Sequence, residues 1–202
     1  MTSGSVASGA TAKTSRRDEL LAMAGRMFAE QGLRNTTVRD IADAAGILSG
    51  SLYHHFDSKE SMVDEIMQRF LDELFTKYRK IVAAGLPSRD SFTQLVVASF
   101  ETIERDHNAV AIYQDEAKRL VTQERFSYIK DRNIEFRQLW LGVLEQGVAD
   151  GTFRSDLDTR MVYRFMRDTV WVAVRWYRPG GTLTADQVAE QYLHIVLDGI
   201  VA

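Results

Sequence analysis

The sequence contains no cysteine, so it can form no disulfide, thiolate metal site or cysteine nucleophile. Its only two prolines, Pro87 and Pro179, leave long stretches in which a helix can run without interruption. No apolar run approaches the roughly 20 residues that a membrane-spanning helix needs, and the N-terminal residues lack the apolar core of a signal peptide. We therefore expect a cytoplasmic protein that makes no contact with a membrane.

An excess of basic residues is also lacking. The 202 residues include 25 Lys and Arg against 28 Asp and Glu, which gives a formal net charge of −3. Residues 1–60 hold seven residues of each sign, so the acidic excess lies beyond them. A protein that binds nucleic acid through bulk charge would be basic. An interpretation as a DNA-binding protein therefore has to rest on a motif.

Helical periodicity is what the sequence has in abundance. Hydrophobic residues make up 45% of the chain, enough for a packed core, and strand-like alternation is absent. Residues 1–14 are rich in Gly, Ser, Ala and Thr and are predicted to be a flexible tail. A first helix is expected to begin after the capping residue Ser15 and to stop at Gly32. With two short helices near residues 37–56, the fold is predicted to be all-α with about nine helices, the longer ones at residues 59–84, 88–106, 108–120, 123–150, 158–178 and 184–200.

Residues 36–56 have the pattern of two short helices joined by a tight turn. Thr36 or Thr37 is placed to cap the first of them, and Gly46 ends it. Ala42 is small enough to let a second helix cross closely. The residues expected on the inner face of this helix are Val38, Ile41, Ala42 and Ala45.

The second helix is expected to begin at Ser49, which can cap it, and to be anchored inwards by Leu52 and Phe56, four residues apart. This leaves Gly50, Ser51, Tyr53 and His54 facing outwards. In a helix-turn-helix, the second helix enters the major groove of DNA by its N-terminal end, where short side chains allow a close approach to the bases. The spacing therefore favours a helix-turn-helix over two ordinary surface helices.

This arrangement divides the expected DNA contacts into two groups. Donors to phosphate oxygens, which fix the register on the duplex, are expected from Thr37, Tyr53, His54 and Lys59. Contacts to base edges are expected from Arg39, Ser49, Gly50 and Ser51.

The motif also carries a family resemblance. Phe28, Gly32, Thr36-Thr37-Val38, Ile41-Ala42, Ala45-Gly46, Leu52-Tyr53, His55-Phe56 and Lys59-Glu60 together resemble the N-terminal domain of the TetR family over residues 16–66. The resemblance implies a helix-turn-helix domain at residues 15–60 and a helical effector-binding and dimerisation domain at residues 61–202. Its implied partners are double-stranded operator DNA, a small hydrophobic effector and a second copy of the chain.

Residues 47–60 resemble, more narrowly, the actinobacterial steroid-catabolism repressors of the KstR type. That resemblance implies a repressor of steroid and cholesterol catabolism genes that is released from a palindromic operator by a CoA thioester of a steroid fragment. Three alternatives remain open: a regulator of fatty-acid or xenobiotic responses with another hydrophobic effector, a transcriptional activator, and a helical enzyme that binds acyl-CoA.

The expected helix at residues 158–178 combines apolar residues with arginines. Arg167, Trp171 and Arg175 fall four apart, which would place an indole between two guanidinium groups on one stripe. Such a stripe suits a flat ligand that carries an anionic group. Arginine and tryptophan are also enriched in protein interfaces, so a dimer interface is the alternative.

Two further aromatic residues are candidates for effector contact. Trp140 lies in an apolar stripe of the expected helix at residues 123–150, and Phe100 lies in one of the helix at residues 88–106. Stripes of this kind more often form the core than line a pocket. Both interpretations stay open for each residue.

An enzyme is not expected. None of the four histidines, His54, His55, His107 and His194, belongs to a zinc-site pattern, and the sequence has no Gly-rich phosphate loop or Gly-x-Ser-x-Gly turn. No cofactor or metal is therefore expected.

Overall fold

The computed structural model describes residues 15–201, so the predicted flexible tail at residues 1–14 lies outside the described residues. Within that range the chain forms nine α-helices and two 3₁₀ helices, and its one β-type contact is an isolated bridge between Phe153 and Val201. The predicted all-α fold of about nine helices is confirmed. The helices are α1 (Arg16–Gln31), α2 (Val38–Ala44), α3 (Ser49–Tyr53), α4 (Lys59–Ala83), α5 (Ser88–Arg105), α6 (His107–Leu120), η1 (Glu124–Phe126), α7 (Tyr128–Ala149), α8 (Thr159–Trp171), η2 (Val172–Arg175) and α9 (Ala185–Ile200).

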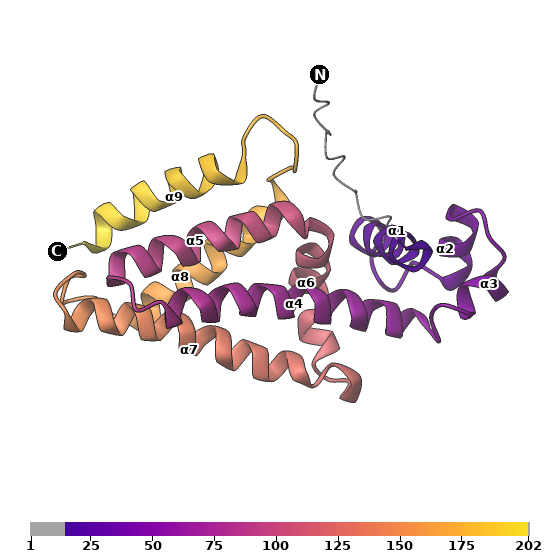
Figure 1. Ribbon diagram of the computed structural model, residues 1–202, viewed down its shortest axis with the longest axis horizontal. Coiled ribbons are helices and arrows are strands. Elements are labelled where there is room, and N and C mark those ends of the chain that lie inside the picture. Colours follow the sequence, from indigo (N-terminus) through magenta and orange to yellow (C-terminus); the bar gives the residue numbers. More distant parts are fainter. Residues whose placement is uncertain (1–14, 202) are drawn as a thin grey trace, which may run out of the picture.

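The helices form two parts (Figure 1). Helices α1–α3 and the first turns of α4 make a small group at one end, which we call the head. The rest of α4 runs through the larger part, which we call the body. There α5, α6 and α7 pack against it, α8 packs on α5 and α7, and α9 packs on α5. Met62 and Val63 of α4 are buried beside the head, whereas Leu71, Phe75 and Tyr78 are buried in the body. Because one continuous helix serves both parts, no linker separates them.

Local signals set the helix ends. The Ser15 hydroxyl accepts a hydrogen bond from the Asp18 backbone N–H at 3.2 Å and caps α1, as predicted. Gly32 ends α1 with a φ of +85°, a conformation that only glycine adopts without strain. Ser58 caps α4 in the same manner, through a reciprocal pair of bonds with Ser61.

Aromatic rings dominate the core of the body. Ten of them form a continuous set of edge and tilted contacts, which we call the aromatic cluster, drawn from α4, α5, α6, α7, α8 and the loop after α7. Phe136 lies at its centre, with ring centroids 5.7 to 6.5 Å from five other rings. The cluster comprises Phe70, Phe75, Tyr78, Phe92, Tyr113, Phe136, Trp140, Phe153, Tyr163 and Trp171.

One predicted helix is shorter than expected. Residues 158–178 were predicted as one helix, but α8 ends at Trp171 and the chain continues as the 3₁₀ helix η2. A 3₁₀ helix turns every three residues, so Arg175 does not continue the stripe of Arg167 and Trp171. The predicted placement of an indole between two guanidinium groups on one helical stripe is therefore wrong.

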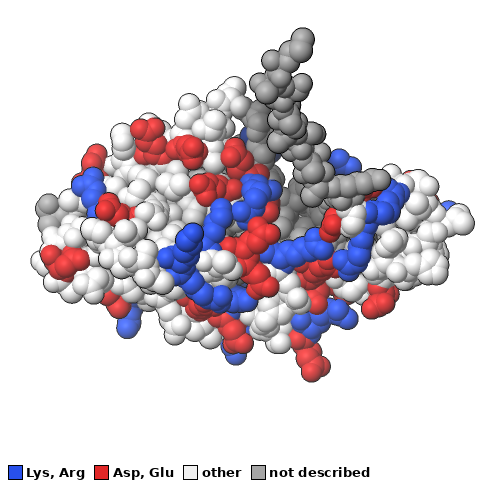
Figure 2. Space-filling view, viewed as in Figure 1, with Lys and Arg blue, Asp and Glu red and all other residues white. Residues whose placement is uncertain are grey.

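Charged side chains of both signs alternate over the face shown in Figure 2, and no large area of a single sign appears there. The end of the molecule where α3 lies is mostly uncharged in this view, in keeping with the α3 sequence Ser-Gly-Ser-Leu-Tyr. Within residues 15–201, no helix is both long enough and apolar enough to cross a membrane.

Candidate nucleic-acid interface and ligand core

Helix α2 begins with a capping box between Thr37, the residue before the helix, and Asp40. The Thr37 hydroxyl and backbone N–H both donate to the Asp40 carboxylate, at 2.7 and 2.8 Å, and the Asp40 N–H donates back to the Thr37 hydroxyl at 3.2 Å. These bonds hold the pKa of Asp40 below its ordinary value. Both Thr37 donors predicted for phosphate are thus engaged inside the helix, and a phosphate would have to replace Asp40 to reach them. Arg39 is exposed, with only a loose ion pair to Asp43 at 3.7 Å.

Helix α3 presents the outward face that its spacing predicts. Leu52 and Phe56 are buried in the head. Ser49 does not cap α3, however: the capping position is Leu48, one residue earlier, and no side chain bonds the free N–H groups there. Ser49 is instead the first residue of the helix. The residues predicted to face outwards are exposed, namely Gly50, Ser51, Tyr53 and His54.

Leu48 is a residue that the sequence reasoning missed. Its side chain is 81% exposed beside Ser49 and Gly50, so it belongs to the outward face and not to the core of the head. The sequence did contain a signal that Leu48 is exposed. Gly46 already ends α2 and Ile47 fills the turn, so no inward position is left for a second apolar residue.

Lys59 supports the head from within. Its Nζ donates to the backbone oxygens of Leu33 at 2.7 Å and Thr36 at 3.0 Å, and so fixes the loop between α1 and α2 on the start of α4. Hydrogen bonds from a charged donor are the stronger kind. The structure therefore gives Lys59 a supporting role, and the phosphate contact predicted for it stays a prediction.

Replacement of Lys59 by methionine is expected to lower the free energy of unfolding by about 2 kcal/mol, because two loop carbonyls lose a charged donor. Chemical denaturation without DNA measures this, with Lys77→Met as the control, since Lys77 makes only an exposed ion pair with Glu101. Equal stabilities of the two variants would contradict the supporting role. If Lys59 also contacts a DNA phosphate, the slope of log affinity against log salt should be smaller in magnitude by about 1 for Lys59→Met than for the wild-type protein.

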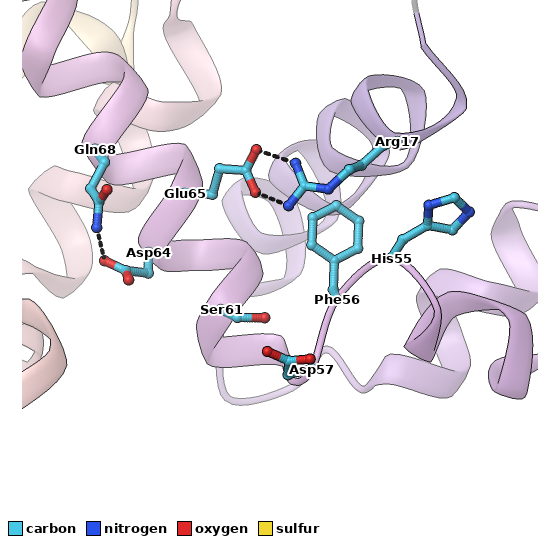
Figure 3. Close-up of a pocket in the computed structure, with 8 residues that line it drawn as sticks. All are labelled: Arg17, His55, Phe56, Asp57, Ser61, Asp64, Glu65 and Gln68. Carbon is cyan, nitrogen blue, oxygen red and sulfur yellow. Dashed lines mark hydrogen bonds and ion pairs between the residues drawn. The ribbon is translucent and has the colours of Figure 1, made fainter.

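A network of ion pairs joins α1 to α4 at the edge of an open cavity of about 340 Å³ (Figure 3). The Arg17 guanidinium lies over the Phe56 ring, 4.5 Å from its centroid, and makes a forked pair with the Glu65 carboxylate. Arg69 bonds the same carboxylate and also Asp18 of α1, at 2.8 Å. The Arg17 pair holds the pKa of Glu65 below its ordinary value. The orientation of the head on α4 is thus fixed by charged side chains as well as by packing.

The predicted effector residues on α8 and η2 separate in the structure. Trp171 is buried in the aromatic cluster, with its ring 6.3 Å from Phe70 and 6.1 Å from Phe136. Arg167 bonds Asp168 at 2.7 Å and lies over the ring of Tyr163. Arg175 is exposed and pairs with Asp115 of α6 at 3.3 Å.

Trp140 and Phe100 are both buried, as the core interpretation of their stripes expected. Trp140 belongs to the aromatic cluster and touches Phe136, as Trp171 does. Phe100 lies elsewhere, with its ring 5.7 Å from Tyr192 of α9. The structure thus brings Trp140 and Trp171 together at Phe136, places Arg167 over the neighbouring ring of Tyr163, and leaves Phe100 and Arg175 outside that group.

Comparison with known proteins assigns both parts of the chain. Residues 20–66 match the family described as bacterial regulatory proteins, tetR family, and residues 85–200 match the tetracyclin repressor-like C-terminal domain. The chain belongs to the TetR family. The predicted resemblance is confirmed, and helices α2 and α3 lie within the region that matches the tetR family. Helix α4 spans the stretch between the two matched regions.

Individual relatives narrow the comparison. The chain is 68% identical over 188 residues to the HTH-type transcriptional repressor KstR2 of Rhodococcus jostii (strain RHA1), covering 93% of this chain and 92% of that protein. The solved structure of the ketosteroid transcriptional regulator KstR2 of Mycobacterium tuberculosis is 62% identical, covers 96% of this chain and 98% of its own, and superposes with a TM-score of 0.92. The complex of AibR with isovaleryl coenzyme A and operator DNA, at 20% identity, coverage of 90% and 97% and a TM-score of 0.76, shares the fold.

Proposed function

We propose that this TetR regulator is a homodimeric repressor that binds a palindromic operator, is released by a CoA thioester of a steroid degradation intermediate, and controls steroid and cholesterol catabolism genes. The observation that carries the proposal is the 68% identity with the KstR2 repressor over nearly the whole of both chains. The similarity to the ketosteroid regulator, with a TM-score of 0.92, supports the steroid role. The complex of AibR, which shares the fold, with isovaleryl coenzyme A and operator DNA supports the choice of a CoA thioester.

On DNA, the outward face of α3 would enter the major groove, and two heads would lie about one helical turn of DNA apart. Short side chains at Ser49, Gly50 and Ser51 allow a close approach to base edges, while Arg39 can reach a guanine. Leu48 adds an apolar contact suited to the methyl group of a thymine. Contacts to phosphates would come from Tyr53, His54, Thr37 and Lys59.

The effector would bind in the body, at the side of the aromatic cluster where Phe136 is half-buried. Burial raises the pKa of Tyr163 there, and the positive charges of Arg167 and Arg137 oppose that rise. An anionic group of the effector would compete with Asp168 for Arg167, which lies over the Tyr163 ring. Trp171 and Trp140 offer flat faces to a ring system. Phe100 and Arg175 would take part only through a change in the arrangement of α8 and α9.

The dimer would form through the outer faces of α8 and α9. Large apolar side chains remain exposed there, among them Phe165 at 65% and Ile195 at 77%. A hydrogen bond between the hydroxyls of Thr169 and Tyr192, at 2.9 Å, links α8 to α9. Apolar patches of this kind on a folded chain mark an interface.

Replacement of Phe165 by glutamate is expected to raise the dissociation constant of the dimer at least about tenfold, because a carboxylate would lose its hydration in an apolar interface. Light scattering after size exclusion over a dilution series measures the change. Val82→Glu, at an exposed apolar residue of α4, is the control. An unchanged dimer would place the interface elsewhere.

The experiment that tests the proposed function is a gel-shift assay on DNA flanking the gene, with specific competitor and with added thioesters. Sequence-selective binding that steroid-fragment CoA thioesters relieve, and simple fatty acyl-CoAs do not, is the expected result. Relief by fatty acyl-CoAs alone would replace the steroid role by a fatty-acid one. A coupling of about 1 to 3 kcal/mol between the two sites would weaken binding roughly 5- to 150-fold.

A further inference from the structure

Leu48 stands at a position where a helix-capping residue is expected. It directly precedes α3, and its φ of −71° and ψ of 144° are those of a capping residue, but its side chain can accept no hydrogen bond from the first turn. The other three helices that form the head are each preceded by a residue whose hydroxyl caps them, namely Ser15, Thr37 and Ser58. A serine, threonine, aspartate or asparagine in place of Leu48 would stabilise α3 in the same way, so the leucine makes the head less stable than it could be.

The Leu48 side chain does not contribute to the core of the head in return. It is 81% exposed, more than any other large apolar side chain within residues 15–201. Leu52 and the half-buried Ile47 already provide the apolar contacts of this turn and of α3. Single exposed apolar residues are common on protein surfaces, but stability does not explain one that also takes the place of a cap.

The residues that follow Leu48 let its side chain approach another surface closely. Ser49, Gly50 and Ser51 are small, and a Cβ at Gly50 would meet no atom within 4 Å. Helix α3 contains no charged residue, and the end of the molecule where it lies is mostly uncharged in Figure 2. Leu48 therefore lies beside short polar side chains, on the face that would enter the major groove.

The base edges in the major groove select what this leucine can contact. Adenine, guanine and cytosine present hydrogen-bond donors and acceptors there, and thymine adds the one apolar group, its C5 methyl. A leucine against a donor or acceptor would take that group away from water without replacing its hydrogen bond. Against the methyl group it would bury apolar surface on both sides. Because leucine has no charge, the contact would add nothing to the binding of phosphates, and its effect would fall on the choice of base.

We propose that Leu48 is a specificity-determining residue that selects thymine at one position of each operator half-site through the C5 methyl group, and that α3 lacks a cap because of this contact. The inference rests on the proposed operator binding and assigns one base of the half-site. In a homodimer on a palindrome, two copies of Leu48 would meet two symmetry-related thymines. Loss of the methyl group is expected to weaken binding about fourfold in one half-site and about fifteenfold in both.

The test replaces thymine by uracil in the DNA fragment that flanks the gene, one symmetric pair of positions at a time. Uracil pairs as thymine does and lacks only the methyl group. Wild-type protein is expected to lose affinity about fifteenfold at the pair that Leu48 contacts. Leu48→Ser is expected to bind the thymine and uracil forms of that pair equally, and to melt at the same or a higher temperature than wild type, because serine supplies the cap. Leu183→Ser, at an exposed leucine before α9, is the control and should keep the wild-type dependence on the methyl group.

The uracil series on the wild-type protein needs no variant, and Leu48→Ala, which has a shorter side chain and no cap, separates the lost contact from the gained cap. It should lose the dependence on the methyl group as Leu48→Ser does. Selective binding that no uracil pair weakens, or a dependence that both Leu48 variants keep in full, overturns the inference and leaves the proposed operator binding intact. If the fragment shows no sequence-selective binding at all, the proposed function is wrong, and this inference falls with it.

Discussion

Leucine in place of Gly50 is expected to abolish operator binding while leaving the fold intact. Gly50 lies in α3, is exposed, and has no atom within 4 Å of where a Cβ would lie. The added side chain therefore disturbs nothing in the head, and the better helix propensity of leucine favours α3 by up to about 1 kcal/mol. The same side chain would stand between the helix and the bases, so several contacts would be lost at once.

Affinity for the operator is accordingly expected to fall at least about 100-fold, while the melting temperature stays the same or rises. Gly142→Leu is the matched control, because Gly142 is exposed in α7 with equal space around it. That variant should share the stability and bind DNA as wild type does. Gel-shift assays measure the operator affinity, and thermal melting measures the stability, of the wild-type protein and the two variants. Tight operator binding by Gly50→Leu would mean that α3 does not enter the groove.

Alanine in place of Gly147 is expected to destabilise the protein by about 3 kcal/mol, which for a chain of this size lowers Tm by roughly 6 to 12 °C. A Cβ at this position of α7 would lie 2.2 and 2.3 Å from two carbons of the Phe153 ring. Phe153 is buried and packs on Phe92 with centroids 5.7 Å apart, so its ring cannot turn away freely. The backbone N–H of Phe153 also donates to the Gly147 oxygen at 2.8 Å, which fixes the two residues together.

Gly142→Ala, in the same helix, is expected to have the opposite sign and to stabilise the protein by about 0.5 to 1 kcal/mol, because a Cβ there meets no atom. Thermal or chemical denaturation of both variants, without DNA or ligand, measures the contrast. Should both alanines prove stabilising, the contact of Phe153 with α7 would be wrong.

The head was predicted well from the sequence because its determinants are local. Ser15 and Gly32 bound α1 through contacts with their own neighbours, and Leu52 and Phe56 are buried as their four-residue spacing requires. The wrong assignment of a cap to Ser49 is also local: a serine before a helix is a good cap only if the chain turns there, and the chain turns one residue earlier, at Leu48.

The structure of the body was predicted less well where contacts between segments distant in the sequence determine it. Nothing in the sequence before Pro179 marks the end of α8, yet the chain tightens into η2 after Trp171. Tyr177 is then held by Glu104 and by His107, residues of α5 and α6 some 70 positions away. The surroundings of Trp140 were equally hidden, since its neighbours come from three helices. Sequence periodicity assigns a residue to the core but cannot say which groups surround it there.

Because α4 is continuous, a small tilt of the helix in the body produces a larger displacement of the head. At 1.5 Å per residue, its 25 residues extend about 37 Å from the head into the centre of the body. A tilt of about 5° at the body end would swing the far end by about 3 Å, close to the rise of about 3.4 Å between successive base pairs. The body therefore needs no large rearrangement to misalign two heads on their operator. A tilt of this size, which small adjustments of packed side chains allow, already displaces a head by about the spacing of one base pair.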